Sequence, residues 1–189
     1  ITAFTNLTHD HLDYHKTMEE YFSEKLKLFN LNKDNGSSVV MIDDDYGKRI
    51  ADLNSNVKCI SLKNEDADYF CTSYSINSFG LAGTLAWDSE TLDFESKLIG
   101  SFNLENLTLA ASIAIELNIS AQSIAKGIEN CTNIDGRLHL VENQKNQMIF
   151  LDYAHSPDAY FRTLKALEEN FSRPCLLYTS PSPRDRSLS

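Results

Sequence analysis

The 189-residue sequence predicts an α/β fold that carries a small antiparallel sheet. Between residues 38 and 62, short apolar segments rich in β-branched residues alternate with a helical segment, which is typical of strands buried on both faces. Between residues 69 and 98, three strand-like segments follow one another with turn residues between them. With 42% hydrophobic residues, the chain can bury a real core.

The first half of the chain contains the clearest helix, over Thr17–Phe29. Its apolar residues recur at helical spacing, and Thr17 with Glu20 forms a predicted capping box. Acidic residues 43–45 follow the first predicted strand directly. The elements expected after the first helix are a strand over 38–42, a helix over 46–53 and a strand over 57–62.

The segment Tyr69–Leu98 predicts three strands, with turns near Asn77–Gly80 and Asp88–Glu90. We expect these strands to form a small antiparallel sheet inserted in, or attached to, the α/β body. The elements expected after it are helices over 103–117 and 120–128, strands over 138–141 and 148–151 around a polar hairpin, and a helix from 156 to about 170.

The charge and the cysteines restrict the class of protein. Acidic residues outnumber basic ones by 27 to 17, which gives a net charge of −10 and argues against a general binder of nucleic acid or anionic membranes. A local phosphate site is still compatible with this charge. The four scattered cysteines form no C-x-x-C pair and indicate buried thiols in a reducing compartment. The sequence therefore predicts a cytoplasmic protein without membrane insertion.

A dense group of histidines and carboxylates lies in Thr8–His15, which holds three of the five histidines. Such side chains can bind a divalent cation, although a polar loop leading into a helix is the alternative. Lys25 lies beside the apolar stripe of the following helix. A lysine in that place is usually solvated, and a functional one needs a lowered pKa or a covalent modification.

Two further segments carry polar groups near predicted helix and strand ends. Asn103 and Asn106 lie three residues apart at a helix start, where they share a face and act either as caps or as ligand contacts. Arg137 follows the turn residues Asp135 and Gly136. Its guanidinium suits a phosphate or a base, and a surface arginine is the alternative.

The segment Leu151–Ala159 runs from a strand end through a loop into a capped helix. Ligands of α/β folds bind at the carboxyl ends of strands, so Asp152 and His155 lie where nucleotide sites are built. Asp152 can accept hydrogen bonds from ribose hydroxyls, and His155 can donate one to a phosphate. Capping by Ser156 requires no function at all.

Read together, these segments resemble the Mur ligase superfamily, and within it the UDP-N-acetylmuramoyl-tripeptide synthetases. The match covers most of residues 3–170, and the combination of DHLDYH with DYAHSPDA is specific. The resemblance implies part of a central ATPase domain, with a mostly parallel sheet, helices and a small antiparallel sheet, followed by the start of a Rossmann-like domain. The matching stretches are Thr5–His15, Tyr21–Phe29, Gly100–Asn106, Gly136–Arg137 and Asp152–Ala159.

The resemblance implies a role for each matching residue. Lys25 matches a carbamylated lysine of catalytic importance that, with His11, helps to hold Mg²⁺ at the phosphates of ATP. A carbamate turns a cationic amine into an anionic oxygen ligand, which a hard cation prefers. The residues that match nucleotide contacts are Asn103 and Asn106 near the base and ribose, Arg137, Asp152 on the ribose and His155 near the phosphates.

The implied reaction joins a diamino acid, either meso-diaminopimelate or L-lysine, to UDP-MurNAc-L-Ala-D-Glu through an acyl phosphate during peptidoglycan precursor synthesis. No nucleic-acid partner is expected, and the full-length enzyme is expected to be a monomer. The alternatives are another ligase of the superfamily, either cyanophycin-synthetase-like or D-glutamate-adding, and a non-catalytic nucleotide-binding relic.

The resemblance also predicts how the chain is divided. Residues 1–145 match the later part of the central domain. Residues 146–174 match the first strand and helix of the C-terminal domain. Residues 175–189 are either a disordered tail or foreign sequence that resembles a translated cloning or sequencing adapter. Because the family's P-loop lies upstream of Thr5, we expect an internal fragment that does not turn over ATP alone.

Overall fold

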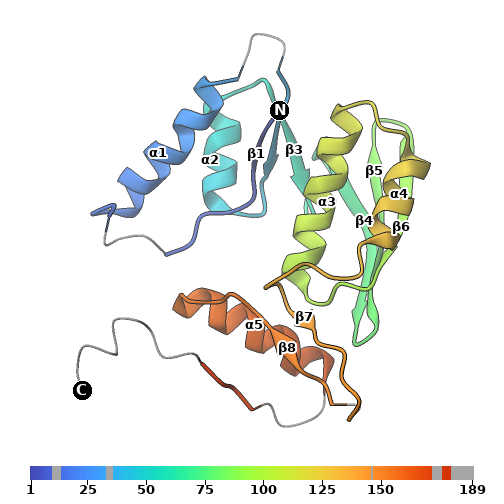
Figure 1. The fold of residues 1–189 in the computed structure, drawn as a ribbon. Helices are drawn as coiled ribbons and strands as arrows, with labels where there is room; N and C mark the ends of the chain where they lie inside the picture. The colour runs from blue at the N-terminus through green and yellow to red at the C-terminus, as the bar shows by residue number, and fades with distance from the viewer. Residues whose placement is uncertain (10–13, 33–35, 146, 172–175, 180–189) are drawn as a thin grey trace.

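The computed structural model describes residues 1–9, 14–32, 36–145, 147–171 and 176–179. A six-stranded sheet with helices on both faces forms the main body, and a two-stranded sheet with one helix follows it (Figure 1). The predicted α/β fold is confirmed. The elements are β1 (Thr2–Phe4), α1 (Met18–Asn30), β2 (Ser38–Met41), α2 (Asp45–Leu53), β3 (Val57–Ser61), β4 (Tyr69–Asn77), β5 (Gly80–Trp87), β6 (Glu90–Ser96), α3 (Ser101–Glu116), α4 (Ala121–Asn130), β7 (His139–Leu140), β8 (Phe150–Leu151) and α5 (Pro157–Asn170).

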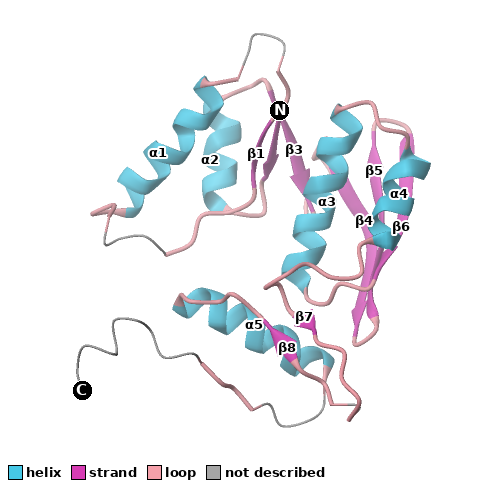
Figure 2. Ribbon diagram, viewed as in Figure 1, coloured by secondary structure: helices cyan, strands magenta, loops and turns pink. Residues whose placement is uncertain are grey.

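Adjacent residues of β2 pack into different layers of the main body. Val39 belongs to the core beneath α3 and α4, whereas Val40 belongs to the core beneath α1 and α2. Both side chains are fully buried, because the side chains of a strand point alternately to the two faces of its sheet. The sheet is therefore the middle of three layers, as Figure 2 shows in cyan and magenta.

The order of strands in the sheet follows the chain, from β1 at one edge to β6 at the other. The pairs from β1 to β4 are parallel, and β4, β5 and β6 form an antiparallel meander. The three predicted strands of this region are thus confirmed. They are fused to the parallel strands through β4 rather than forming a separate sheet.

A short loop joins the parallel strands β3 and β4. The end of β3 pairs only with the start of β4, over two residue pairs, so the chain does not have to return along the whole length of β3 between them. The pairs are Ile60 with Tyr69 and Ser61 with Phe70, so the chain needs no long crossover of the usual kind. The Asp68 carboxylate accepts a hydrogen bond from the backbone N–H of Cys59 at 2.8 Å. This contact gives a hydrogen-bond acceptor to a backbone N–H of β3 at a residue that β4 does not pair with.

Helix α1 begins as the sequence predicts but closes its capping box differently. The Thr17 hydroxyl accepts a hydrogen bond from the Glu20 N–H at 3.1 Å. The Glu20 carboxylate accepts in return from the N–H of Lys16, one residue before the cap, at 3.0 Å. Both contacts satisfy backbone donors near the first turn of the helix.

The segment after α4 forms a smaller unit at one end of the main sheet, where α5 lies near the N-terminal end of α3 (Figure 1). Its strands β7 and β8 are two residues each, shorter than the predicted 138–141 and 148–151. They pair with each other in antiparallel fashion, His139 with Leu151 and Leu140 with Phe150. The boundary predicted between the central and C-terminal domains, after residue 145, stays a prediction. Most of the predicted tail, residues 175–189, lies outside the described residues.

Candidate functional site

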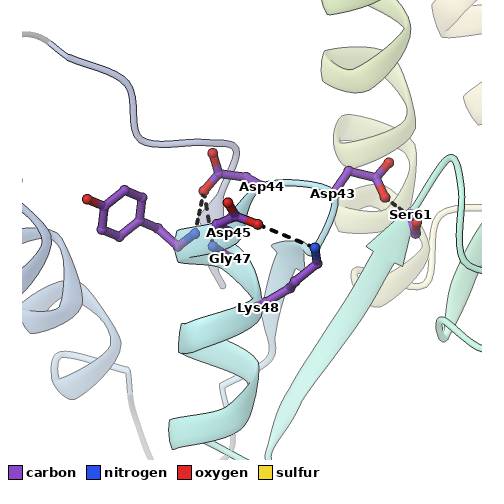
Figure 3. A network of polar contacts seen from close by, with 7 residues as sticks. Asp43, Asp44, Asp45, Gly47, Lys48 and Ser61 are labelled. Atoms are coloured by element: carbon purple, nitrogen blue, oxygen red, sulfur yellow. Dashed lines mark hydrogen bonds and ion pairs between the residues drawn. The ribbon is translucent and has the colours of Figure 1, made fainter.

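The carboxyl ends of β1, β2 and β3 meet at one edge of the sheet, since the three strands are parallel. Two acidic residues follow β2: Asp43 contacts Ser61 at the end of β3, as Figure 3 shows, and Asp44 contacts the segment after β1. This edge is where α/β folds place their ligands. We call it the carboxyl edge.

Asp43 joins the end of β2 to the end of β3. Its carboxylate accepts hydrogen bonds from the hydroxyl of Ser61 and from the backbone N–H of Leu62, the latter at 2.8 Å. Ser61 is fully buried, and its oxygen also accepts from the N–H groups of Lys63 and Asn64. These bonds order the loop that follows β3.

Asp44 joins the segment after β1 to the start of α2. One carboxylate oxygen accepts from the N–H groups of Tyr46 and Gly47 at 2.9 and 3.1 Å, as an N-cap does. The other oxygen accepts from the N–H of Leu7 at 3.3 Å. The sequence indicated acidic residues at this strand end but did not predict their role.

Asn103, one of the predicted nucleotide contacts, lies in the first turn of α3 and is only 1% exposed. Its amide nitrogen donates to the carbonyl of Ile99 at 2.8 Å, whereas its side-chain oxygen has no hydrogen-bond partner among the described residues. A buried polar atom without a partner is costly and marks a place where a ligand or water can bind. Asn106, on the next turn, is exposed.

Glu105 lies between these two asparagines and was not predicted as a site residue. Burial raises the pKa of its carboxyl, and the charge of Arg162 opposes that rise. Asp43 and Asp44 raise this pKa further, while Lys63 lowers it. The start of α3, the carboxyl edge and helix α5 therefore share one electrostatic environment.

Replacing Glu105 by glutamine is expected to increase the free energy of unfolding at neutral pH. A raised pKa means that the ionised carboxylate destabilises the fold above that pKa, and this cost disappears as the pH falls below the ordinary carboxyl pKa. Denaturant unfolding at pH 7 and pH 4 measures the difference. The exposed Glu90 provides the control substitution, and equal pH profiles for the two variants would contradict the expectation.

The contact between α5 and α3 depends on Gly100, the N-cap of α3. A Cβ atom at Gly100 would lie 3.2 Å from the Cβ of Ala166 and 2.9 Å from the ring of Phe102. Gly100 also has φ +97°, a conformation that side chains rarely adopt. The absence of a side chain thus lets α5 approach the start of α3 closely.

Three predicted site residues come together around β7 and β8. The Asp152 carboxylate accepts hydrogen bonds from the N–H groups of Leu138 and Ala154 at 2.8 Å each, and from the hydroxyl of Thr163 at 3.3 Å. Arg137 precedes Leu138 and is exposed, and His155 is exposed with its Nδ1 2.9 Å from the carbonyl of Tyr153. The sequence did not predict that Asp152 would also order the backbone.

Lys25 lies apart from these residues, on α1 in the opposite layer. It is exposed, with its amine 5.4 Å from the ring centroid of Tyr21. The ring of His15 stacks on Tyr21 with centroids 4.8 Å apart, so the end of the DHLDYH motif lies one helical turn from Lys25. The predicted metal ligand His11 lies outside the described residues.

The described residues contain no group of three or more histidine, cysteine or carboxylate side chains arranged to hold a metal ion. Lys25 as a free amine is not a magnesium ligand either. The part of the chain that the structure describes thus does not by itself form a metal site.

Among the described residues, no helix has both the length and the apolar character that a membrane crossing requires.

A sheet with parallel strands between two helical layers, and polar residues after the carboxyl ends of those strands, is typical of the α/β class that binds nucleotides and similar ligands at this edge. Residues 1–114 match the family described as the Mur ligase middle domain, and the chain belongs to this family. The resemblance predicted from the motifs is confirmed.

Similar proteins agree with this family. The chain is 36% identical over 188 residues to the UDP-N-acetylmuramoyl-L-alanyl-D-glutamate--2,6-diaminopimelate ligase of Fusobacterium nucleatum, covering 97% of this chain and 38% of that protein. It is 35% identical over 170 residues to the ligase of the same name from Nostoc sp., covering 88% and 34%. The chain therefore spans little more than a third of the length of these relatives.

Solved structures show the same fold. A UDP-N-acetylmuramoyl-L-alanyl-D-glutamate--2,6-diaminopimelate ligase superimposes with a TM-score of 0.71 at 29% identity, over 90% of this chain and 36% of that one. MurF from Acinetobacter baumannii gives a TM-score of 0.77 at 20% identity, over 89% and 37%. At that lower identity, the likeness to MurF concerns the fold alone.

Proposed function

We propose that this chain forms the central part of an ATP-dependent amide ligase that adds a diamino acid to UDP-MurNAc-L-Ala-D-Glu. The observation that carries the proposal is the similarity of nearly the whole chain to ligases named for adding 2,6-diaminopimelate. The choice between meso-diaminopimelate and L-lysine follows only the names of these relatives. The substrates are precursors made in the cytoplasm, where we place the protein as a monomer.

The nucleotide is proposed to bind between the start of α3 and the β7–β8 unit. Asn106, Arg137 and His155 are exposed there and can reach a ligand. The side-chain oxygen of Asn103, for which the described part of the chain provides no hydrogen-bond partner, is suited to a donor on the base or an ordered water. Asp152 already accepts three hydrogen bonds, and the lone pairs of its two oxygens leave room for one from a ribose hydroxyl.

The proposed reaction transfers the γ-phosphoryl group of ATP to the γ-carboxylate of the D-glutamyl residue. The diamino acid then attacks the acyl phosphate through its amine, and inorganic phosphate leaves. Such chemistry depends mainly on positioning and on charge stabilisation. When bound, Mg²⁺ supplies charge neutralisation at the phosphates, and we propose that Lys25, as a carbamate, and His11 contribute to holding it.

A chimera tests this function. Residues 1–171 replace the equivalent segment of the Fusobacterium nucleatum ligase, and release of phosphate from ATP is measured with UDP-MurNAc-L-Ala-D-Glu and diaminopimelate. We expect turnover that depends on all three substrates, with L-lysine as the comparison amine. A folded chimera that never forms an amide would contradict the proposal. The 189-residue chain alone is expected not to hydrolyse ATP.

A further inference from the structure

We propose that Asp44 is a positioning residue, which fixes the chain segment leading from β1 into the histidine-rich motif against the carboxyl edge. The inference rests on the proposed function, in which that motif serves the phosphates. Asp44 itself touches no substrate in this proposal. It acts through the backbone of Leu7.

The two oxygens of Asp44 serve two different elements. Oδ1 accepts hydrogen bonds from the first turn of α2, through Tyr46 and Gly47. Oδ2 accepts from the N–H of Leu7, 37 residues earlier in the chain. One carboxylate therefore links the start of α2, where Figure 3 shows its contacts, to the segment after β1.

Leu7 is fixed by its side chain as well as by its backbone. The side chain is 5% exposed and belongs to the same core cluster as Phe22 of α1. The segment after β1 thus has an apolar anchor in the core and a polar anchor at Asp44. Two residues further on, His9 is exposed, so the fixed segment ends where the motif begins.

Capping of α2 alone does not require an aspartate. Asparagine and serine are equally good N-caps, but neither can replace the second oxygen. The amide nitrogen of asparagine would place a donor against the Leu7 N–H, and the serine side chain is too short to reach it. An aspartate that uses both oxygens is the residue that can cap α2 and fix Leu7 together.

Two substitutions separate these roles. In Asp44→Asn and Asp44→Ser, we expect amide hydrogen exchange at Leu7 to accelerate by about tenfold or more, while exchange in α2 and the denaturant midpoint stay near those of the unchanged chain. Asp45→Asn is the control, because Asp45 is exposed and pairs only with Lys48 among the contacts of Figure 3. Unchanged exchange at Leu7 in both variants would overturn the inference.

The functional consequence is measured in the ligase chimera. Asp44→Asn is expected to lower kcat by about tenfold or more with little change in KM for the diamino acid, whereas Asp45→Asn changes neither. A folded chimera that is inactive before any substitution contradicts the proposed function and leaves the exchange result standing. An active chimera whose kcat is unaffected by Asp44→Asn disproves the positioning role.

Discussion

Lys25→Ala in the ligase chimera is expected to lower turnover by roughly 100- to 1,000-fold, the range seen when one preorganised group that stabilises charge in a transition state is removed. Under the proposed function, carbamylated Lys25 supplies an anionic oxygen toward Mg²⁺, and alanine supplies none. The initial rate of phosphate release at saturating substrates measures the effect.

The matched control for this substitution is Lys27→Ala. Lys27 lies on the same helix, is exposed and pairs with Glu24 at 2.6 Å, a contact expected to contribute little to stability. Its loss should leave turnover within about twofold. Full turnover by the Lys25→Ala chimera would contradict the role of this residue.

The carbamate itself has two independent readouts. Short carboxylic acids should restore part of the turnover of Lys25→Ala but not alter the Lys27→Ala chimera. With ¹³C-bicarbonate, a carbamate carbon resonance should appear in the unchanged chimera and disappear in Lys25→Ala. Loss of turnover without either signal would assign Lys25 a role as an ammonium, which is consistent with its position over the ring of Tyr21.

The sequence predicts well those elements whose signals are local. Helix α1 has its cap residue and apolar stripe in one continuous segment, and the strands of the meander are separated by clear turns. β1 was not predicted, because three residues are too few to show an alternating pattern. The fusion of the meander with the parallel strands depends on the pairing of β3 with β4, which no local pattern contains.

The candidate site was predicted only where a residue type suggests its own chemistry. Arg137, Asp152 and His155 were predicted in this way, and the structure places them near β7 and β8, while their roles stay a prediction. Asp44 and Glu105 were not predicted, because the contact of Asp44 with Leu7 and the burial that raises the pKa of Glu105 arise only in the folded chain. An acidic residue directly after a buried parallel strand was the available signal for Asp44.

Gly47→Ala is expected to destabilise the fold by about 3 kcal/mol, the upper range for overpacking. A Cβ at Gly47 would lie 1.9 Å from the carbonyl oxygen of Met41, and that oxygen belongs to the last residue of β2. The backbone cannot rotate away as a flexible side chain does, so α2 must move off the sheet. Equilibrium unfolding in urea measures the loss.

The same substitution at Gly127 should have the opposite sign. No atom lies within 4 Å of a Cβ built at Gly127, which is exposed on α4, so alanine should stabilise that helix by about 0.5–1 kcal/mol. The pair distinguishes a glycine required by close packing from one that only weakens its helix. Because α2 carries the cap at Asp44, Gly47→Ala should also accelerate amide exchange at Leu7, whereas Gly127→Ala should not. Equal stability of the two variants would show that α2 is not held against β2 as closely as the structure indicates.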